Sequence, residues 1–219
     1  MDNRQLFFIF LPLFGMLMGC SKEKPKILII GDSISIGYMP YLETHFADRA
    51  VIEHNPGNAQ HTGTGLQKIK EWVGGEKWDI IQVNWGLWDL CYRHPDSKVQ
   101  GNRDKINGKL THTVEEYSSN LDSIVTILKQ VTDAKLIFLT TTYVPEQEAG
   151  RFKQDAVRYN EAAKKIMKKH SILVHDIYEA SETIHHQFGK GSDDVHYTDK
   201  GYEQLSKPVI NFLNQQMLN

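Results

Sequence analysis

The chain contains 219 residues, of which 40% are hydrophobic and 24% are charged, and its formal net charge at pH 7 is −2. This length and composition predict one ordinary globular domain with a hydrophobic core of its own. No basic patch of the kind that binds nucleic acid stands out in a chain of pI about 6.5, so we expect no RNA or DNA partner.

Residues 1–20 have the pattern of a bacterial lipoprotein signal peptide. Arg4 provides one positive charge, and residues 6–19 form the apolar run LFFIFLPLFGMLMG. A run of this length is shorter than a comfortable membrane span and fits the hydrophobic region of a signal peptide. Leu17-Met18-Gly19-Cys20 resembles a lipobox, which implies that Cys20 is lipidated and becomes the mature N-terminus. The alternative is an uncleaved anchor, or a cytosolic chain with an apolar start.

The organisation expected from this pattern is a polar tether at residues 21–25 and one domain at residues 26–219. The domain is then extracytoplasmic, on the periplasmic or the cell-surface side, and is held to a membrane through the lipid on Cys20. Cys91 is the second of two cysteines, and it has no disulfide partner if Cys20 carries a lipid. The fold is therefore expected to depend on its core rather than on a disulfide.

From Lys26 onward, short apolar runs alternate with longer amphipathic stretches. Near-continuous aliphatic and β-branched runs are typical of parallel strands buried on both faces. The sequence predicts five such strands, at residues 26–30, 51–54, 78–85, 134–144 and 171–178. It predicts helices at residues 65–73, 113–131, 154–170 and 199–218, with a capping box of Thr113 and Glu116. This alternation predicts an α/β fold, a three-layer doubly wound (flavodoxin-like) sandwich with a five-stranded parallel sheet.

Polar residues collect where ligands bind in such folds, outside the carboxyl ends of the strands. Ser33 follows the first predicted strand, and the segment NPGNAQHTGTG at residues 55–65 follows the second. The third strand leads into a long polar segment, residues 91–112, which we expect to be irregular. Loops of this length are often lids or binding loops.

Ser33 can be either a nucleophile or only the cap of the helix that follows. A serine hydroxyl is a poor nucleophile unless a base takes its proton, and the base works best when an acid orients it. Asp193 and His196 have the spacing Asp-x-x-His, which on a tight loop can leave one ring nitrogen free for Ser33. We therefore predict Ser33 as the nucleophile, His196 as the general base and acid, and Asp193 as the residue that orients His196. Asp32 is expected to order the turn through bonds to the backbone.

These blocks resemble those of the SGNH (GDSL-type) hydrolase family. Gly31-Asp32-Ser33-Ile34-Ser35 resembles the block that carries the nucleophile, and Asp193-Asp194-Val195-His196 resembles the block that carries the acid and the base. The resemblance extends over residues 26–216. It implies a sandwich of the SGNH-hydrolase type and a serine ester hydrolase that needs no metal and no cofactor.

The resemblance also implies an oxyanion hole, and here the chain departs from the family pattern. The backbone N–H groups of Ser33 and Gly57 are expected to contribute, Gly57 being preferred to Gly63 because it comes sooner after the strand. The family's third block reads Gly-x-Asn-Asp, and its asparagine donates to the oxyanion. This chain has Gly86-Leu87-Trp88-Asp89 instead, with Trp88 in the asparagine position.

Three side chains are candidates for the missing donor: Asn84, Trp88 and Asn58. Asn84 stands two residues before Gly86 and would point to the same side of a strand, so it is the predicted donor. Trp88 can donate one indole N–H. Trp88 and Asn58 are also the predicted substrate-binding residues.

The predicted function is hydrolysis of small acyl esters, foremost O-acetyl esters, on a carbohydrate through an acyl-enzyme. The carbohydrate is implied by the resemblance, because many lipid-anchored extracytoplasmic members of the family act on glycans. A lysophospholipase or thioesterase is the alternative within the class, and the partner is then another small ester. A non-catalytic glycan-binding lipoprotein on the same fold is the alternative outside it, favoured by Trp88. No metal site is expected, because His185-His186 have no Cys/Asp cluster nearby in the sequence.

Overall fold

The structure, a computed structural model, describes residues 23–96 and 102–218. Its central sheet has five parallel strands in the order β2-β1-β3-β6-β7. The strands are β1 (Lys26–Ile30), β2 (Val51–His54), β3 (Ile80–Val83), β6 (Lys135–Leu139) and β7 (Leu173–His175). A sheet that grows outward on both sides of its first strand is the flavodoxin-like, doubly wound type. The predicted fold class is confirmed.

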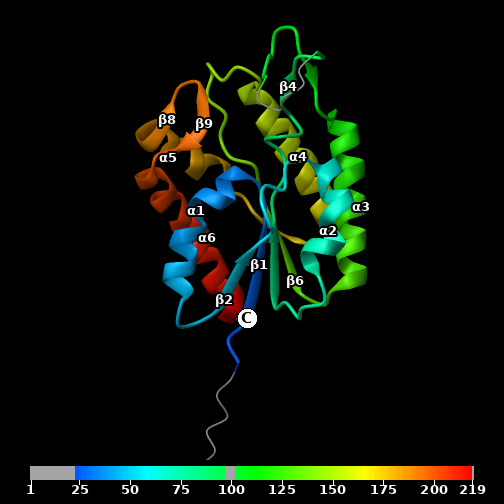
Figure 1. The fold of residues 1–219 in the computed structure, drawn as a ribbon, viewed down its shortest axis with the longest axis vertical. Helices are drawn as coiled ribbons and strands as arrows, with labels where there is room; N and C mark the ends of the chain where they lie inside the picture. Colours follow the sequence, from blue (N-terminus) through cyan, green and yellow to red (C-terminus); the bar gives the residue numbers. More distant parts are fainter. Residues whose placement is uncertain (1–22, 97–101, 219) are drawn as a thin grey trace, which may run out of the picture.

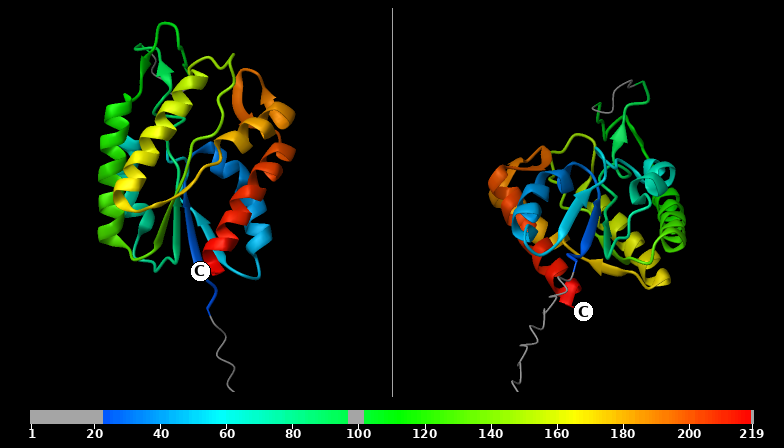
Figure 2. Two further views of the ribbon diagram at one scale, coloured as in Figure 1. Left: turned by 180° about the vertical axis from the view of Figure 1, so that it is seen from behind. Right: turned by 60° about the horizontal axis from the view of Figure 1, so that its bottom comes forward.

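Six helices of the described ranges cover the two faces of the sheet (Figure 1). One face carries α1 (Ser33–Phe46), α5 (Tyr178–Phe188) and α6 (Asp199–Leu218), and the other carries α2 (Thr62–Val73), α3 (Val114–Val131) and α4 (Lys153–His170). The view from behind in Figure 2 shows the same separation. The molecule therefore has the three layers that the alternating pattern predicts.

The core forms where the sequence is most apolar. Residues Ile27–Ile30 of β1 and all four residues of β3 are buried, as expected for strands covered on both faces. In α3 the predicted apolar face is buried, and Thr113 and Glu116 form the predicted capping box.

Three of the predicted strands are longer than the strands in the structure. The apolar run at residues 134–144 pairs only as far as Leu139. Beyond it, side chains of neighbouring helices satisfy the backbone: Asn160 Oδ1 accepts from the Thr141 N–H at 2.8 Å, and Ser181 Oγ accepts from the Tyr143 N–H at 2.8 Å. These bonds replace the ladder that a longer strand would need.

Two small hairpins and one helix go beyond the prediction. The polar segment 91–112 contains β4 (Tyr92–Arg93) and β5 (Lys109–Leu110), which pair antiparallel. A second antiparallel pair joins β8 (Gly189–Gly191) to β9 (Asp194–Tyr197), directly after the unpredicted helix α5. Both hairpins lie at the end of the molecule toward which the five parallel strands point (Figure 1).

Within residues 23–96 and 102–218, no helix is both long enough and apolar enough to cross a membrane. The predicted signal peptide and Cys20 lie outside the described residues.

Candidate active site

Ser33 is presented at the carboxyl edge of the sheet by the sharp passage from β1 into α1. The strand ends at Ile30, and the helix begins at Ser33 with Asp32 as its N-cap. Asp32 Oδ1 accepts a hydrogen bond from the Ile34 N–H at 3.0 Å, which is the turn-ordering role predicted for it. A Cβ at position 31 would lie 2.6 Å from Ser35 Oγ, so a residue larger than glycine would require Ser35 to shift.

His196 reaches the same point from the other end of the chain. Its Nε2 lies 2.9 Å from Ser33 Oγ, although 163 residues separate the two in sequence. His196 belongs to β9, which packs against α1, the helix that begins at Ser33. The structure thus brings together the serine and the histidine that the sequence pairs.

The residue on the far side of the imidazole is Asp194, not the predicted Asp193. Asp194 Oδ1 lies 2.6 Å from His196 Nδ1 and accepts from the His196 backbone N–H at 3.0 Å. The prediction assumed a tight loop, whereas residues 194–197 form a strand. Alternate residues of a strand share a face, so Asp194 lies beside His196, and Asp193 is exposed at the turn.

The Asp194 carboxylate is held in its charged form. Partial burial works to raise its pKa, but the hydrogen bonds from the backbone and the ring of His196 outweigh this, and the pKa is lowered. An ionised Asp194 requires a proton on His196 Nδ1, which leaves the Nε2 lone pair of a neutral ring facing Ser33. The order Ser33–His196–Asp194 is therefore arranged for removal of the serine proton.

The loop after β2 is tied to the loop that carries Ser33. Asn55, which the sequence did not single out, accepts from the Gly31 N–H at 2.9 Å and donates to the Gly57 carbonyl at 3.1 Å. The Ala59 N–H donates to the Gly31 carbonyl at 2.9 Å. Gly57 has φ +68°, a backbone conformation that favours glycine. These bonds hold the predicted oxyanion residue Gly57 close to the nucleophile turn.

The prediction for Asn84 is wrong. Its side-chain NH₂ group donates to two backbone carbonyls, those of Leu139 at 2.9 Å and Thr140 at 3.2 Å. An amide nitrogen has two hydrogens, so none remains for an oxyanion. Asn84 instead links the residue after β3 to the end of β6. Gly86, two residues later, has φ +152°, and a Cβ there would lie 2.9 Å from Thr141.

A cavity of about 200 Å³ opens beside Ser33 and His196. Trp88, one of the two predicted substrate-binding residues, is in its wall. The residues that line it are Asp32, Ser33, Leu87, Trp88, Arg93, Arg103, Arg151, Val195 and His196. Asn58 is not among them; its Oδ1 accepts from the Gln60 N–H at 2.8 Å.

The three arginines of this wall were missed by the sequence prediction. Arg93 and Arg103 lie in the segment 91–112, where the prediction noted an abundance of polar residues but could not place them. Arg151 precedes α4 and carries no motif. Only the folded path of these segments brings the three guanidinium groups to one cavity.

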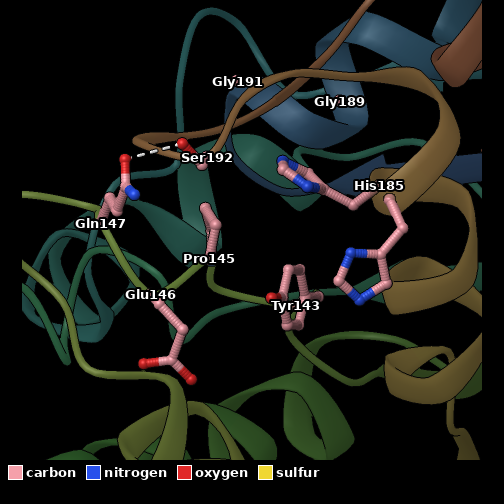
Figure 3. Close-up of a pocket in the computed structure, with 9 residues that line it drawn as sticks. Tyr143, Pro145, Glu146, Gln147, His185, Gly189, Gly191 and Ser192 are labelled. Carbon is pink, nitrogen blue, oxygen red and sulfur yellow. Dashed lines mark hydrogen bonds between the residues drawn. The ribbon is translucent and has the colours of Figure 1, made fainter.

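A second cavity, of about 330 Å³, lies behind the β8–β9 hairpin and contains neither Ser33 nor His196 (Figure 3). On one side Gln147 Oε1 accepts from Ser192 Oγ at 2.8 Å, and on the other lies His185. The backbone N–H of Gln147 also donates to the Ser192 carbonyl at 3.1 Å. These contacts fix the turn that precedes Asp194.

The part of the chain that the structure describes holds no group of three or more His, Cys, Asp or Glu residues placed to bind a metal ion. Asp89 and His112 form one of the Asp–His pairs, joined at 2.8 Å. Asp89 also accepts from the backbone and the hydroxyl of Thr62, so its carboxylate is used within the protein.

A doubly wound parallel sheet with a serine, a histidine and an aspartate in hydrogen-bonded sequence at its carboxyl edge has the arrangement of a serine hydrolase. Residues 29–204 match the model of the GDSL-like lipase/acylhydrolase family. The chain belongs to this family, also called SGNH, and is an esterase or acylhydrolase in class. None of the curated proteins matches it significantly.

Solved structures share the fold at low sequence identity. A lipase/acylhydrolase from Enterococcus faecalis matches with a TM-score of 0.69 and 19% identity, over 88% of this chain and 96% of that one. An acetylxylan esterase from Geobacillus stearothermophilus matches with a TM-score of 0.64 and 18% identity, over 85% and 93%. The acetyl xylan esterase AlAXEase matches with a TM-score of 0.66 and 13% identity, over 86% and 99%. At these identities the likeness concerns the fold alone.

Proposed function

We propose that the protein is a serine esterase that removes small acyl groups, foremost O-acetyl groups, from a carbohydrate. The observation that carries the proposal is the hydrogen-bonded series from Ser33 Oγ through both nitrogens of His196 to the Asp194 carboxylate. It supplies a nucleophile, a base and a group that orients the base, which is what acyl transfer through a serine requires.

In the proposed reaction, Ser33 Oγ attacks the ester carbonyl carbon while His196 Nε2 takes the hydroxyl proton. The tetrahedral intermediate collapses when the bond to the sugar oxygen breaks, and His196 returns the proton to that oxygen. Water then attacks the acyl-enzyme, His196 takes one of its protons, and the acid leaves as Ser33 Oγ is protonated again. The ionised Asp194 stabilises the imidazolium in both halves.

The oxyanion is assigned to the backbone N–H groups of Ser33 and Gly57 and to the indole N–H of Trp88. Ser33 is the first residue of α1, where backbone N–H groups lack helical partners and the helix dipole is positive. Trp88 is in the cavity wall beside Ser33 and stands in sequence where the family has its donating asparagine.

Two observations support a small, polar substrate. The cavity beside Ser33 measures about 200 Å³ and three arginines line it, so it favours a short acyl group on a hydrophilic molecule over a long hydrocarbon chain. Two of the structurally similar proteins are named acetylxylan esterases. Their likeness makes acetylated xylan a suitable first substrate to test.

The proposal includes a membrane anchor and an extracytoplasmic location. It rests on the apolar run at residues 6–19 and on the lipobox-like residues that end at Cys20. A lipid-anchored esterase of this kind would act on glycans outside the cytoplasm. Metabolic labelling with a fatty-acid analogue tests it: label on the wild-type chain and none on the Cys20→Ala variant is expected.

The test of the catalytic proposal is hydrolysis of p-nitrophenyl acetate by the wild-type protein and the Ser33→Ala variant. The substitution is expected to lower kcat at least about 10³-fold, because the nucleophile is lost. Ser123→Ala, on the exposed side of α3, is the matched control. Equal rates for wild type and Ser33→Ala would contradict the serine mechanism. Acetate release from acetylated xylan and other acetylated glycans then identifies the substrate.

A further inference from the structure

Three arginines from separate segments meet in the wall of the cavity that holds Ser33 and His196. Arg93 belongs to β4, Arg103 forms an isolated bridge to it, and Arg151 comes from the residues before α4. The predicted reaction needs none of these cations at the nucleophile or the base. Their convergence therefore calls for a separate explanation.

Arg151 and Arg103 share a single carboxylate. Glu148 Oε1 lies 2.8 Å from Arg151 Nη1 and 2.6 Å from Arg103 Nη1, and Glu148 is fully buried. Glu148 Oε2 accepts from the Gly150 N–H at 2.7 Å. Glu148 balances one of the two arginines that it contacts.

Arg93 has no carboxylate partner among the described residues. Its Nη1 is buried without a hydrogen-bond partner, and its guanidinium carbon lies 4.9 Å from the centre of the Trp88 ring. Of the three arginines, Arg93 is the one that forms neither an ion pair nor a side-chain hydrogen bond with any residue that the structure describes, whereas Arg103 and Arg151 both bind Glu148.

We propose that Arg93, supported by Arg103 and Arg151, binds an oxyanion group, a carboxylate or a sulfate, on the same substrate molecule that carries the ester. A guanidinium is a planar fork of N–H donors that matches either group in a bidentate fashion. Arg93 lines the cavity that holds Ser33, so an anion bound in that cavity lies next to its guanidinium. The Trp88 ring fixes the plane of the fork.

This inference rests on the proposed esterase function and narrows its substrate class. Ser33, His196 and Arg93 line one cavity, so the anion and the scissile ester belong to neighbouring parts of one molecule. The substrate class is thus an acylated acidic sugar, a uronic acid or a sulfated sugar, rather than a neutral one.

The kinetic test compares two aryl acetates that differ in charge, 4-carboxyphenyl acetate and its methyl ester. The measured quantity is the ratio of kcat/KM for the anionic ester to kcat/KM for the neutral ester. In Arg93→Gln this ratio is expected to fall about 10- to 100-fold relative to wild type, because a charged hydrogen bond to the anion is lost. An unchanged ratio would overturn the proposal.

Arg49→Gln is the matched control. Arg49 also lies over an aromatic ring, 5.3 Å from the centre of Phe46, but it is exposed in the turn after α1. In Arg49→Gln, the ratio of kcat/KM for the anionic ester to kcat/KM for the neutral ester is expected to equal that of wild type. A fall in Arg49→Gln as large as in Arg93→Gln would assign the effect to overall charge and would also overturn the proposal.

Binding to the full-length Ser33→Ala protein separates this inference from the proposed function, because it requires no turnover. D-glucuronate, D-glucose 6-sulfate and D-glucose are titrated and observed by ligand-detected NMR. Tighter binding of glucuronate than of glucose, lost in Ser33→Ala/Arg93→Gln, supports a carboxylate site; the same result for the sulfated sugar alone supports a sulfate site. Equal binding of all three sugars excludes an anion site, even where Ser33-dependent hydrolysis is observed. If the anion still binds but no ester is hydrolysed, the proposed esterase function is wrong and the anion site is still supported.

Discussion

Asp194 and His196 lie on one face of β9 because they are two residues apart in an extended strand. We predict that Asp194→Asn lowers kcat for p-nitrophenyl acetate about 10²- to 10⁴-fold, since an amide neither stabilises the imidazolium nor fixes the proton on Nδ1. Asp193→Asn, one residue away and exposed, is the control and is expected to stay within about threefold of wild type. A large loss in Asp193→Asn with a small one in Asp194→Asn would restore the Asp-x-x-His assignment.

Trp88 serves two purposes in the proposed site, as a donor to the oxyanion and as the surface on which Arg93 rests. Trp88→Phe separates them, because phenylalanine keeps an aromatic face and lacks the indole N–H. In this variant kcat for a neutral acetate is expected to fall about 10²-fold with KM nearly unchanged, because one oxyanion donor is removed. A wild-type kcat in Trp88→Phe would leave the oxyanion to the backbone N–H groups.

At the scale of elements, the β8–β9 hairpin is the part of the fold on which the site most depends. It carries both Asp194 and His196, and it is not part of the central sheet. His185 of α5 holds it: His185 Nε2 lies 2.7 Å from the Asp194 carbonyl, and the ring packs against Tyr197. Burial lowers the pKa of His185, so the ring stays neutral and donates through Nε2–H.

We predict that His185→Phe destabilises the protein by about 1 to 2 kcal/mol, because the Asp194 carbonyl loses its partner in a buried place. The free energy of unfolding in urea measures this. His186→Phe is the neighbouring control, since His186 is exposed and lies 3.7 Å from Glu182; it is expected to change stability by less than about 0.5 kcal/mol. Equal losses in the two variants would show that the hydrogen bond to Asp194 does not stabilise the hairpin.

The elements that could be predicted from the sequence are those whose signal is local. The strands β1 and β3 are buried on both faces and read directly as apolar runs, and the block around Ser33 follows at a fixed distance from β1. The hairpin β8–β9 could not be predicted, because β8 is Gly189-Lys190-Gly191, without an apolar residue, and α5 before it has only two buried positions. Asp194 was missed for this reason: the side chain that faces His196 is decided by strand geometry, not by spacing.

At the scale of the whole molecule, the site is assembled from both ends of the chain. Ser33 is the first residue of α1, and His196 comes from the last strand before α6. Arg93, Arg103 and Arg151 enter from the middle, by loops whose closure involves the buried Glu148. No pattern in the sequence links these arginines, because their meeting is a property of the folded loops. Asn84 was assigned wrongly for the same reason, since its partners, Leu139 and Thr140, come from another strand end.

The stability of the whole domain is expected to depend on pH through His175. This residue lies on the edge strand β7, its ring is stacked on Phe212 at 4.3 Å, and its Nδ1 is buried without a partner in the described residues. Burial lowers the pKa of His175 from 6.5 to about 4, opposed by nearby Asp176. The folded protein therefore resists protonation at a pH where the unfolded chain accepts a proton.

The sign of the effect follows from the two pKa values. Above pH 6.5 both states hold a neutral ring; as the pH falls from 6.5 to 4, the unfolded state binds the proton first and folding loses stability. The full loss of folding stability from this group is about 3 kcal/mol. We predict that His175→Phe, which keeps the stack on Phe212, becomes more stable relative to wild type by that amount between pH 7 and pH 4, measured by urea unfolding. His94→Phe, a half-exposed loop histidine, is the control; a constant difference between His175→Phe and wild type over this range would contradict the buried neutral ring.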